Sequence, residues 1–186
     1  GNVTTIKVTE TAGLNLSNAT VTNVTSVDTT GTTGATTIAI DGGKATYAGG
    51  AGVDTVTVSA ATGGFTKAID LGAGNDTLNL EALTVAQLQA LPVTNVLKGG
   101  EGDDTIALTA AQAVDLSANS TFAGKIEGFE KLSITDKVAV ARTVNMANMD
   151  GITFVREMKK NAAYKFVPVI MLTTEGSDEK KKAGQE

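Results

Sequence analysis

Three short glycine-rich loops, each closed by an aspartate, are the parts of this sequence best suited to bind a ligand. They span residues 49–56, 71–78 and 99–106, and each reads Gly, any residue, Gly, any residue, Asp, any residue, then an aliphatic residue. Glycine permits backbone conformations that other residues avoid, and so can turn carbonyl oxygens toward a common point. Carbonyl and carboxylate oxygens are hard ligands that suit Ca²⁺, which accepts roughly six to eight of them. The pattern therefore predicts calcium binding.

The predicted ligands are the loop aspartates, the loop carbonyls and one neighbouring acid. Asp70 precedes the second loop and could add a carboxylate, while Asn75, Asp103 and Asp41 are weaker candidates. Gly and Asp are also favoured in ordinary β-turns, so plain turns are the alternative interpretation. The predicted set comprises the carboxylates of Asp54, Asp76, Asp104 and Asp70 and the carbonyls of Gly50, Gly52, Gly72, Gly74, Gly100 and Gly102.

Composition removes most enzyme classes and several kinds of partner. The 186 residues include no His and no Cys, which excludes serine triads, thiol nucleophiles and zinc sites with thiolate or imidazole ligands. Fifteen basic residues against twenty acidic ones give a net charge of -5, whereas a nucleic-acid binder needs a basic stripe. No apolar run reaches the roughly 18 residues of a membrane span. We therefore expect no enzyme activity, no nucleic-acid partner and no membrane span.

Short alternating runs rich in Thr, Val and Ile must hold these loops in place. The runs include residues 3–8, 36–40, 54–58, 76–80 and 104–108. Their alternation is typical of half-buried strands. Helical spacing over residues 80–91, ended by Pro92, and over residues 110–119 predicts two short helices. Because the runs recur along the chain, the sequence predicts a mainly β fold, a parallel β-solenoid or β-roll with short helical insertions; a β-sandwich is the alternative.

The loops resemble the glycine-rich nonapeptide repeats of RTX proteins, which are secreted calcium-binding β-rolls. Contiguous RTX repeats share calcium between successive turns, whereas Asp54, Asp76 and Asp104 are 22 and 28 residues apart in this chain. The wider spacing indicates isolated sites between neighbouring loops in place of a continuous row of ions.

The Thr-rich strands and residues 110–134 resemble bacterial surface-layer and related RTX-type cell-surface proteins. The most telling string is Ser-Thr-Phe-Ala-Gly-Lys-Ile-Glu-Gly-Phe-Glu-Lys-Leu-Ser-Ile at residues 120–134. The resemblance implies an extracellular structural coat or adhesin, calcium-dependent folding, and self-association into a lattice or filament. A cell-surface polysaccharide is a further candidate partner. A non-catalytic module of a secreted RTX enzyme is an alternative function.

The last part of the chain has a different composition. Residues 1–140 carry seven Lys, no Arg and fourteen acidic residues, a net charge of -7. Residues 141–186 carry eight basic and six acidic residues, a net charge of +2, together with all four methionines. We therefore expect two regions, residues 1–145 and residues 146–186.

The second region resembles a fragment of a chemotaxis-type response-regulator receiver domain, through the strings at residues 145–152 and 167–174. That resemblance implies a C-terminal α/β fragment and makes a signalling receiver module a further alternative function. The family's phosphoacceptor Asp corresponds to Thr143 here and its turn proline to Ala147, so no phosphotransfer is expected. A fusion, an incorrectly assembled sequence or a coincidental ending would each explain the tail.

Overall fold

The computed structural model describes residues 3–17, 21–92, 94, 96–117, 122 and 124–136. The receiver-like fragment, and with it the expected division into two regions, lies outside these ranges.

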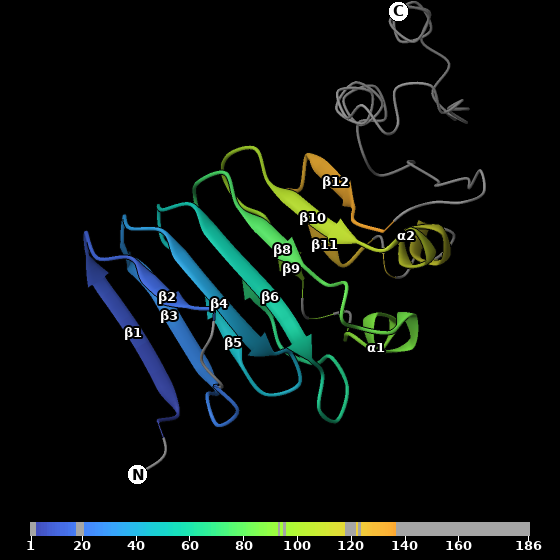
Figure 1. Ribbon diagram of the computed structural model, residues 1–186, viewed down its shortest axis with the longest axis horizontal. Helices are drawn as coiled ribbons and strands as arrows, with labels where there is room; N and C mark the ends of the chain where they lie inside the picture. The colour runs from blue at the N-terminus through green and yellow to red at the C-terminus, as the bar shows by residue number, and fades with distance from the viewer. Residues whose placement is uncertain are drawn as a thin grey trace, which may run out of the picture.

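Parallel strands in two six-stranded sheets make up most of the described chain (Figure 1). Successive strands alternate between the sheets, and every hydrogen-bonded pair is parallel. The first sheet contains, in order, β1 (Thr5–Glu10), β3 (Ser26–Thr32), β5 (Thr46–Ala48), β7 (Ile69–Asp70), β9 (Leu97–Lys98) and β11 (Ile126–Glu127). The second sheet contains, in order, β2 (Leu14–Leu16), β4 (Thr36–Asp41), β6 (Asp54–Ala60), β8 (Thr77–Asn79), β10 (Thr105–Leu108) and β12 (Lys131–Ile134). The prediction of a mainly β chain is therefore confirmed.

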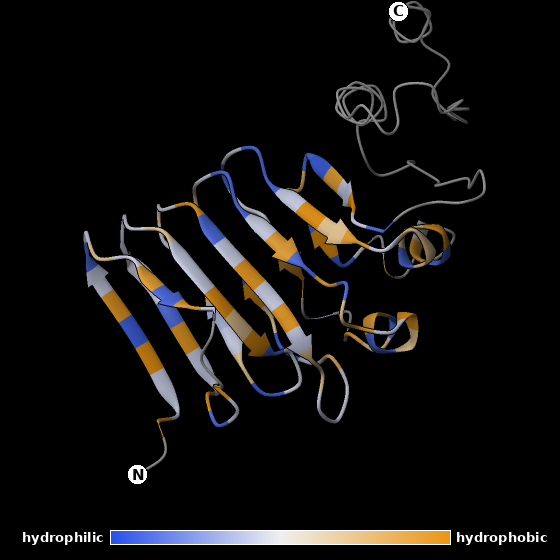
Figure 2. Cartoon of the chain, in the orientation of Figure 1, coloured by the Kyte–Doolittle hydropathy of each residue, from blue (hydrophilic) through white to orange (hydrophobic). Residues whose placement is uncertain are grey.

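Each odd-numbered strand and the even-numbered strand that follows it form one rung of the stack. Side chains of β4, β6 and β8 alternate between a buried and a partly exposed face, and Figure 2 shows the matching banding of hydropathy. The buried face carries an in-register aliphatic row, and the opposite face carries an in-register threonine row. The aliphatic row is Ile38, Val56, Leu78 and Ile106, and the threonine row is Thr37, Thr55, Thr77 and Thr105. Burial of one face thus fixes the register of the sheet.

Two short helices interrupt the strands, close to where the sequence predicts them. α1 (Val85–Gln89) is shorter than the predicted helix over residues 80–91. Leu80 lies directly after β8 and is still hydrogen bonded to β10, because its N–H donates to the carbonyl of Ala107, 3.0 Å away. Thr84 then begins the helix as a capping box with Gln87. α2 (Ala110–Ser117) begins where predicted, and its buried Gln112 donates to the carbonyl of Leu80, 3.0 Å away.

Candidate functional site

The three glycine-aspartate loops stack directly on one another. Each connects an odd-numbered strand to the next even-numbered strand: β5 to β6, β7 to β8 and β9 to β10. The N–H of Ala73 donates to the carbonyl of Gly50 at 2.7 Å, and the N–H of Glu101 donates to that of Gly72 at 2.9 Å. The loops therefore continue the hydrogen bonding of the sheets around the turn.

Glycine is required for this close stacking. Gly100 has φ of 111°, and a Cβ there would lie 1.8 Å from the carbonyl oxygen of Gly72. Gly102 has φ of 131°, and a Cβ there would lie 1.7 Å from that of Gly74. A Cβ on Gly74 would likewise lie 2.5 Å from the carbonyl oxygen of Gly52. The predicted carbonyl ligands of Gly50 and Gly72 thus already accept a hydrogen bond from the next loop, although an oxygen with one such bond keeps a second lone pair.

Asp54, Asp76 and Asp104 form an in-register row, which we call the acidic column. All three are buried, with at most 1% of their surface exposed. Oδ1 of Asp76 accepts from the N–H of Asp54 at 2.7 Å, and Oδ1 of Asp104 accepts from the N–H of Asp76 at 2.8 Å. Each carboxylate therefore ties its own rung to the preceding one. The structure brings these three predicted residues together.

The column continues beyond the residues that the loop pattern predicts. Oδ1 of Asp54 accepts from the N–H of Thr36 at 3.0 Å, and Oε2 of Glu130 accepts from the N–H of Asp104 at 2.8 Å. Glu130 was missed because no Gly-x-Gly loop precedes it. A sequence signal exists, however: Glu130 stands directly before β12, as Asp104 stands directly before β10.

The second carboxylate oxygens of the column have different surroundings. Oδ2 of Asp54 accepts from the hydroxyl of Tyr47, 2.7 Å away. Oδ2 of Asp76 and Oδ2 of Asp104 are buried and have no hydrogen-bond partner among the described residues. No local sequence pattern indicates the Tyr47 contact, because this contact depends on the register of the strands. Two buried carboxylate oxygens on neighbouring rungs are thus left without a donor.

Burial and mutual repulsion disfavour the charged forms of these acids. Burial is the main cause that raises the pKa of Asp76 to about 7, and the charges of Asp104 and Asp54 raise it further. Burial also raises the pKa of Asp104, with the charge of Glu130 adding to the effect. The pKa of Asp54 is raised by burial as well, against the lowering effect of the Tyr47 hydrogen bond. A cation or a proton beside Asp76 and Asp104 would relieve this cost.

Asp70 lies away from the column. It ends β7 on the exposed face, whereas the preceding residue, Ile69, is fully buried. Its Oδ1 accepts from the N–H of Gly72 at 3.2 Å, which stabilises the start of the second loop. The carboxylate of Asp70 therefore lies on the exposed face of the first sheet, whereas the column carboxylates are buried.

Asn75 and Asp103 form a second, outer contact between loops. Oδ1 of Asn75 accepts from the N–H of Asp103 at 3.0 Å, and the Asp103 carboxylate pairs with Lys131 at 3.3 Å. Both residues are exposed. These weaker candidates thus serve loop stacking on the solvent side.

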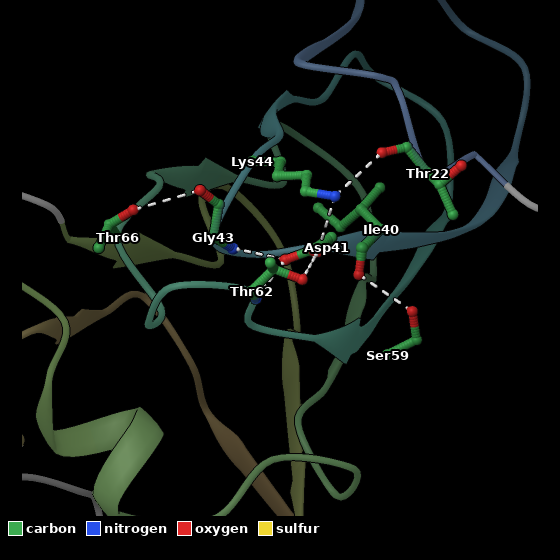
Figure 3. A network of polar contacts seen from close by, with 8 residues as sticks. All are labelled: Thr22, Ile40, Asp41, Gly43, Lys44, Ser59, Thr62 and Thr66. Atoms are coloured by element: carbon green, nitrogen blue, oxygen red, sulfur yellow. Dashed lines mark hydrogen bonds and ion pairs between the residues drawn. The ribbon is translucent and has the colours of Figure 1, made fainter.

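Asp41 belongs to a separate network at the other end of β4 (Figure 3). Its Oδ1 accepts from the N–H groups of Gly43 and Thr62, each at 2.9 Å, and its Oδ2 accepts from the Thr62 hydroxyl and lies 3.8 Å from Nζ of Lys44. Partial burial alone would raise the pKa of Asp41, but these hydrogen bonds hold it below its usual value. Both oxygens of this carboxylate are therefore occupied in stabilising a turn.

The unpartnered oxygens of Asp76 and Asp104 match part of what Ca²⁺ requires. They are hard carboxylate oxygens to which no N–H or O–H group of the described residues donates. Within the described ranges, no three acidic side chains lie close enough together to hold one metal ion. The remaining ligands would therefore be neutral oxygens, from carbonyls or water.

Comparison of the chain with protein-family models, with curated proteins and with solved structures returned no match. No helix in the described part of the chain is long and apolar enough to cross a membrane.

Proposed function

We propose that this chain is a non-enzymatic structural module of a bacterial cell surface, folded as a parallel β-roll and stabilised by Ca²⁺ at the acidic column. The observation that supports calcium binding most directly is the pair of buried Oδ2 atoms of Asp76 and Asp104, which have no hydrogen-bond partner among the described residues. Neighbouring strands lie about 4.8 Å apart, so charges at equivalent positions of adjacent rungs repel strongly in a buried setting. A divalent cation between them converts that repulsion into attraction.

The arrangement of strands supports the β-roll. Successive strands alternate between two sheets, and all neighbouring pairs are parallel, so each rung repeats the path of the one before. Such a stack transmits stability from one rung to its neighbours, which suits a structural element. Calcium would supply charge neutralisation at the turns. The chain's own residues would supply the register, through the bonds from column carboxylates to backbone N–H groups.

Two further features support assembly on a surface. β1 is an edge strand of the first sheet, and edge strands offer backbone groups to another chain. The exposed edge at β1 therefore favours a second copy of the chain as the partner, with self-association along the stack. The threonine row of Thr37, Thr55, Thr77 and Thr105 presents neutral hydroxyl groups on the outer face of the second sheet, which suits a polysaccharide. An extracellular location agrees with both partners.

Thermal unfolding with and without calcium tests the proposal. A ligand at 100 times its Kd that binds only the folded state adds about 2.7 kcal/mol, which corresponds to roughly 5–10 °C for a chain of this size. We expect that rise when millimolar Ca²⁺ replaces EDTA, and a smaller one with Mg²⁺. Asp76→Asn with Asp104→Asn should abolish it, whereas the exposed Asp115→Asn should not. An unchanged melting temperature of the full chain in Ca²⁺ would overturn the proposal.

A further inference from the structure

Asp54 differs from the other two carboxylates of the acidic column in having a side-chain donor on its second oxygen. Asp54 has donors on both oxygens: the N–H of Thr36 at 3.0 Å and the hydroxyl of Tyr47 at 2.7 Å. The Tyr47 oxygen also lies 3.2 Å from Oγ1 of Thr29. Oδ1 of Asp76 and Oδ1 of Asp104 each accept from a backbone N–H, and the second oxygen of each has no donor in the part of the chain that the structure describes.

Strand register explains the difference. Tyr47 in β5 pairs with Ile69 in β7, which pairs in turn with Leu97 in β9. All three side chains are buried and occupy the same row of the first sheet. Only the tyrosine can donate a hydrogen bond, because Ile69 and Leu97 are hydrocarbons. One row of the first sheet therefore decides which column carboxylates are satisfied by the protein itself.

We propose that the Tyr47 hydroxyl takes the place of a cation at Asp54, so that Ca²⁺ binding is confined to the Asp76–Asp104 pair. This inference rests on the proposed function and specifies the site within it. It also goes beyond the sequence, in which the three loops are equivalent. Burial raises the pKa of Tyr47, so its hydroxyl stays protonated and remains a donor to Asp54.

The inference makes the residue opposite each carboxylate a determinant of calcium dependence. A hydroxyl in the row satisfies the neighbouring carboxylate without an ion, and a hydrocarbon leaves that carboxylate dependent on one. Exchanging the two kinds of residue should exchange the behaviour of the rungs. Both directions of the exchange can be tested in the full chain.

The first test adds a hydroxyl beside Asp76. Ile69→Tyr is compared with Ile69→Phe, which has nearly the same bulk without the hydroxyl, so that the pair isolates the donor. By titration calorimetry, we expect Ca²⁺ to bind at least about tenfold more weakly to Ile69→Tyr than to Ile69→Phe. The rise of melting temperature with Ca²⁺ should shrink in the same order. Equal calcium binding by the two variants would overturn the inference.

The second test removes the existing hydroxyl and covers the case in which the bulkier side chains at position 69 prevent folding. Tyr47→Phe leaves Oδ2 of Asp54 without its donor, so a cation becomes useful at that rung. We expect its loss of melting temperature in EDTA to be at least twice its loss in saturating Ca²⁺. An equal loss under both conditions would mean that Tyr47 is only a core hydrogen-bond donor, and would overturn the inference.

The two proposals fail in different ways. If the unmodified chain shows neither heat of calcium binding nor a rise in melting temperature, the calcium function fails and the inference fails with it. If the unmodified chain binds Ca²⁺ but Ile69→Tyr and Ile69→Phe bind it equally, or Tyr47→Phe loses the same melting temperature in EDTA and in Ca²⁺, only the role of Tyr47 is overturned.

Discussion

Oδ1 of Asp104 accepts a hydrogen bond from the backbone N–H of Asp76, 2.8 Å away, although 28 residues separate the two in the chain. The same contact joins Asp76 to Asp54 and Asp54 to Thr36. One carboxylate oxygen thus builds the stack, and in Asp76 and Asp104 the other has no hydrogen-bond partner among the described residues. This division allows removal of the charge to be separated from removal of the hydrogen bond.

Asparagine and alanine at position 76 should separate these two tasks. Asp76→Asn keeps an acceptor for the N–H of Asp54 and removes a buried charge, so in EDTA we expect it to be at least as stable as the unmodified chain. Asp76→Ala leaves that N–H unpaired, which costs about 1–3 kcal/mol relative to Asp76→Asn. Urea unfolding in EDTA measures the difference. Equal stabilities of the two variants would show that the N–H contact contributes nothing.

The calcium-free protein should lose stability as the pH rises toward neutrality. The pKa of Asp76 is raised from 3.8 to about 7 in the folded state, so between these values the folded chain binds more protons than the unfolded chain. Stability contributed by protonated Asp76 is therefore present at low pH and is lost as the pH rises through about 7. Urea unfolding in EDTA, measured from about pH 5 to about pH 8 in steps of about one pH unit, should show this fall in the free energy of unfolding.

The variant Asp76→Asn isolates this effect from the other titrating groups. Asp54 and Asp104, whose pKa values are also raised, act with the same sign as Asp76 but are present in both proteins. Asp41, whose pKa is lowered, acts with the opposite sign and below pH 4, outside the measured window. The stability difference between Asp76→Asn and the unmodified chain should therefore grow with pH. A difference that stays constant would show that Asp76 does not titrate in this range.

Alanine at two glycines with positive φ should have very different effects. A Cβ at Gly100 would lie 1.8 Å from the carbonyl oxygen of Gly72, whereas a Cβ at Gly63, with φ of 76°, has no atom within 4 Å. Gly63→Ala introduces backbone strain alone, so we expect it to lower the free energy of unfolding by about 1 kcal/mol. Gly100→Ala must also separate two loops, so we expect it to lower the free energy of unfolding by more than about 3 kcal/mol. Chemical unfolding gives both values. Similar losses at the two positions would contradict the close stacking of the loops.

Local pattern predicts much of the second sheet and little of the first. β4, β6, β8 and β10 have alternating residues and lie close after glycine-containing turns, so their positions are clear from the sequence. β7 and β9 have two residues each, too few for alternation to be visible, and exist because their neighbours pair with them. α1 is shorter than its helical pattern because Leu80 is hydrogen bonded to Ala107 of the next rung. Tertiary contacts decide these elements.

The same limit applies to the site. The pattern of glycine and aspartate singles out Asp54, Asp76 and Asp104 as candidate ligands, and in the structure hydrogen bonds from backbone N–H groups to carboxylate oxygens link the three. It does not predict that Asp70 faces outward, because this follows from the burial of Ile69 in a two-residue strand. The Tyr47 hydroxyl at Asp54 depends on the register between the sheets, to which no local signal points.

Asp41 lies at the end of β4 that is far from the acidic column. Its pKa is lowered, whereas the pKa values of the column carboxylates are raised. Both of its oxygens accept hydrogen bonds, and its charge is favoured in the folded state. Asp41→Ala leaves the N–H groups of Gly43 and Thr62 without this acceptor, so we expect a loss of about 2–3 kcal/mol in EDTA and in Ca²⁺ alike. Lys44→Ala removes a partly exposed ion pair at 3.8 Å and an exposed hydrogen bond to the carbonyl of Thr22 at 3.4 Å, and should cost less than about 1 kcal/mol. Urea unfolding of both variants under both conditions checks this, and a calcium-dependent loss at Asp41 would place a cation site at this end of the sheet as well.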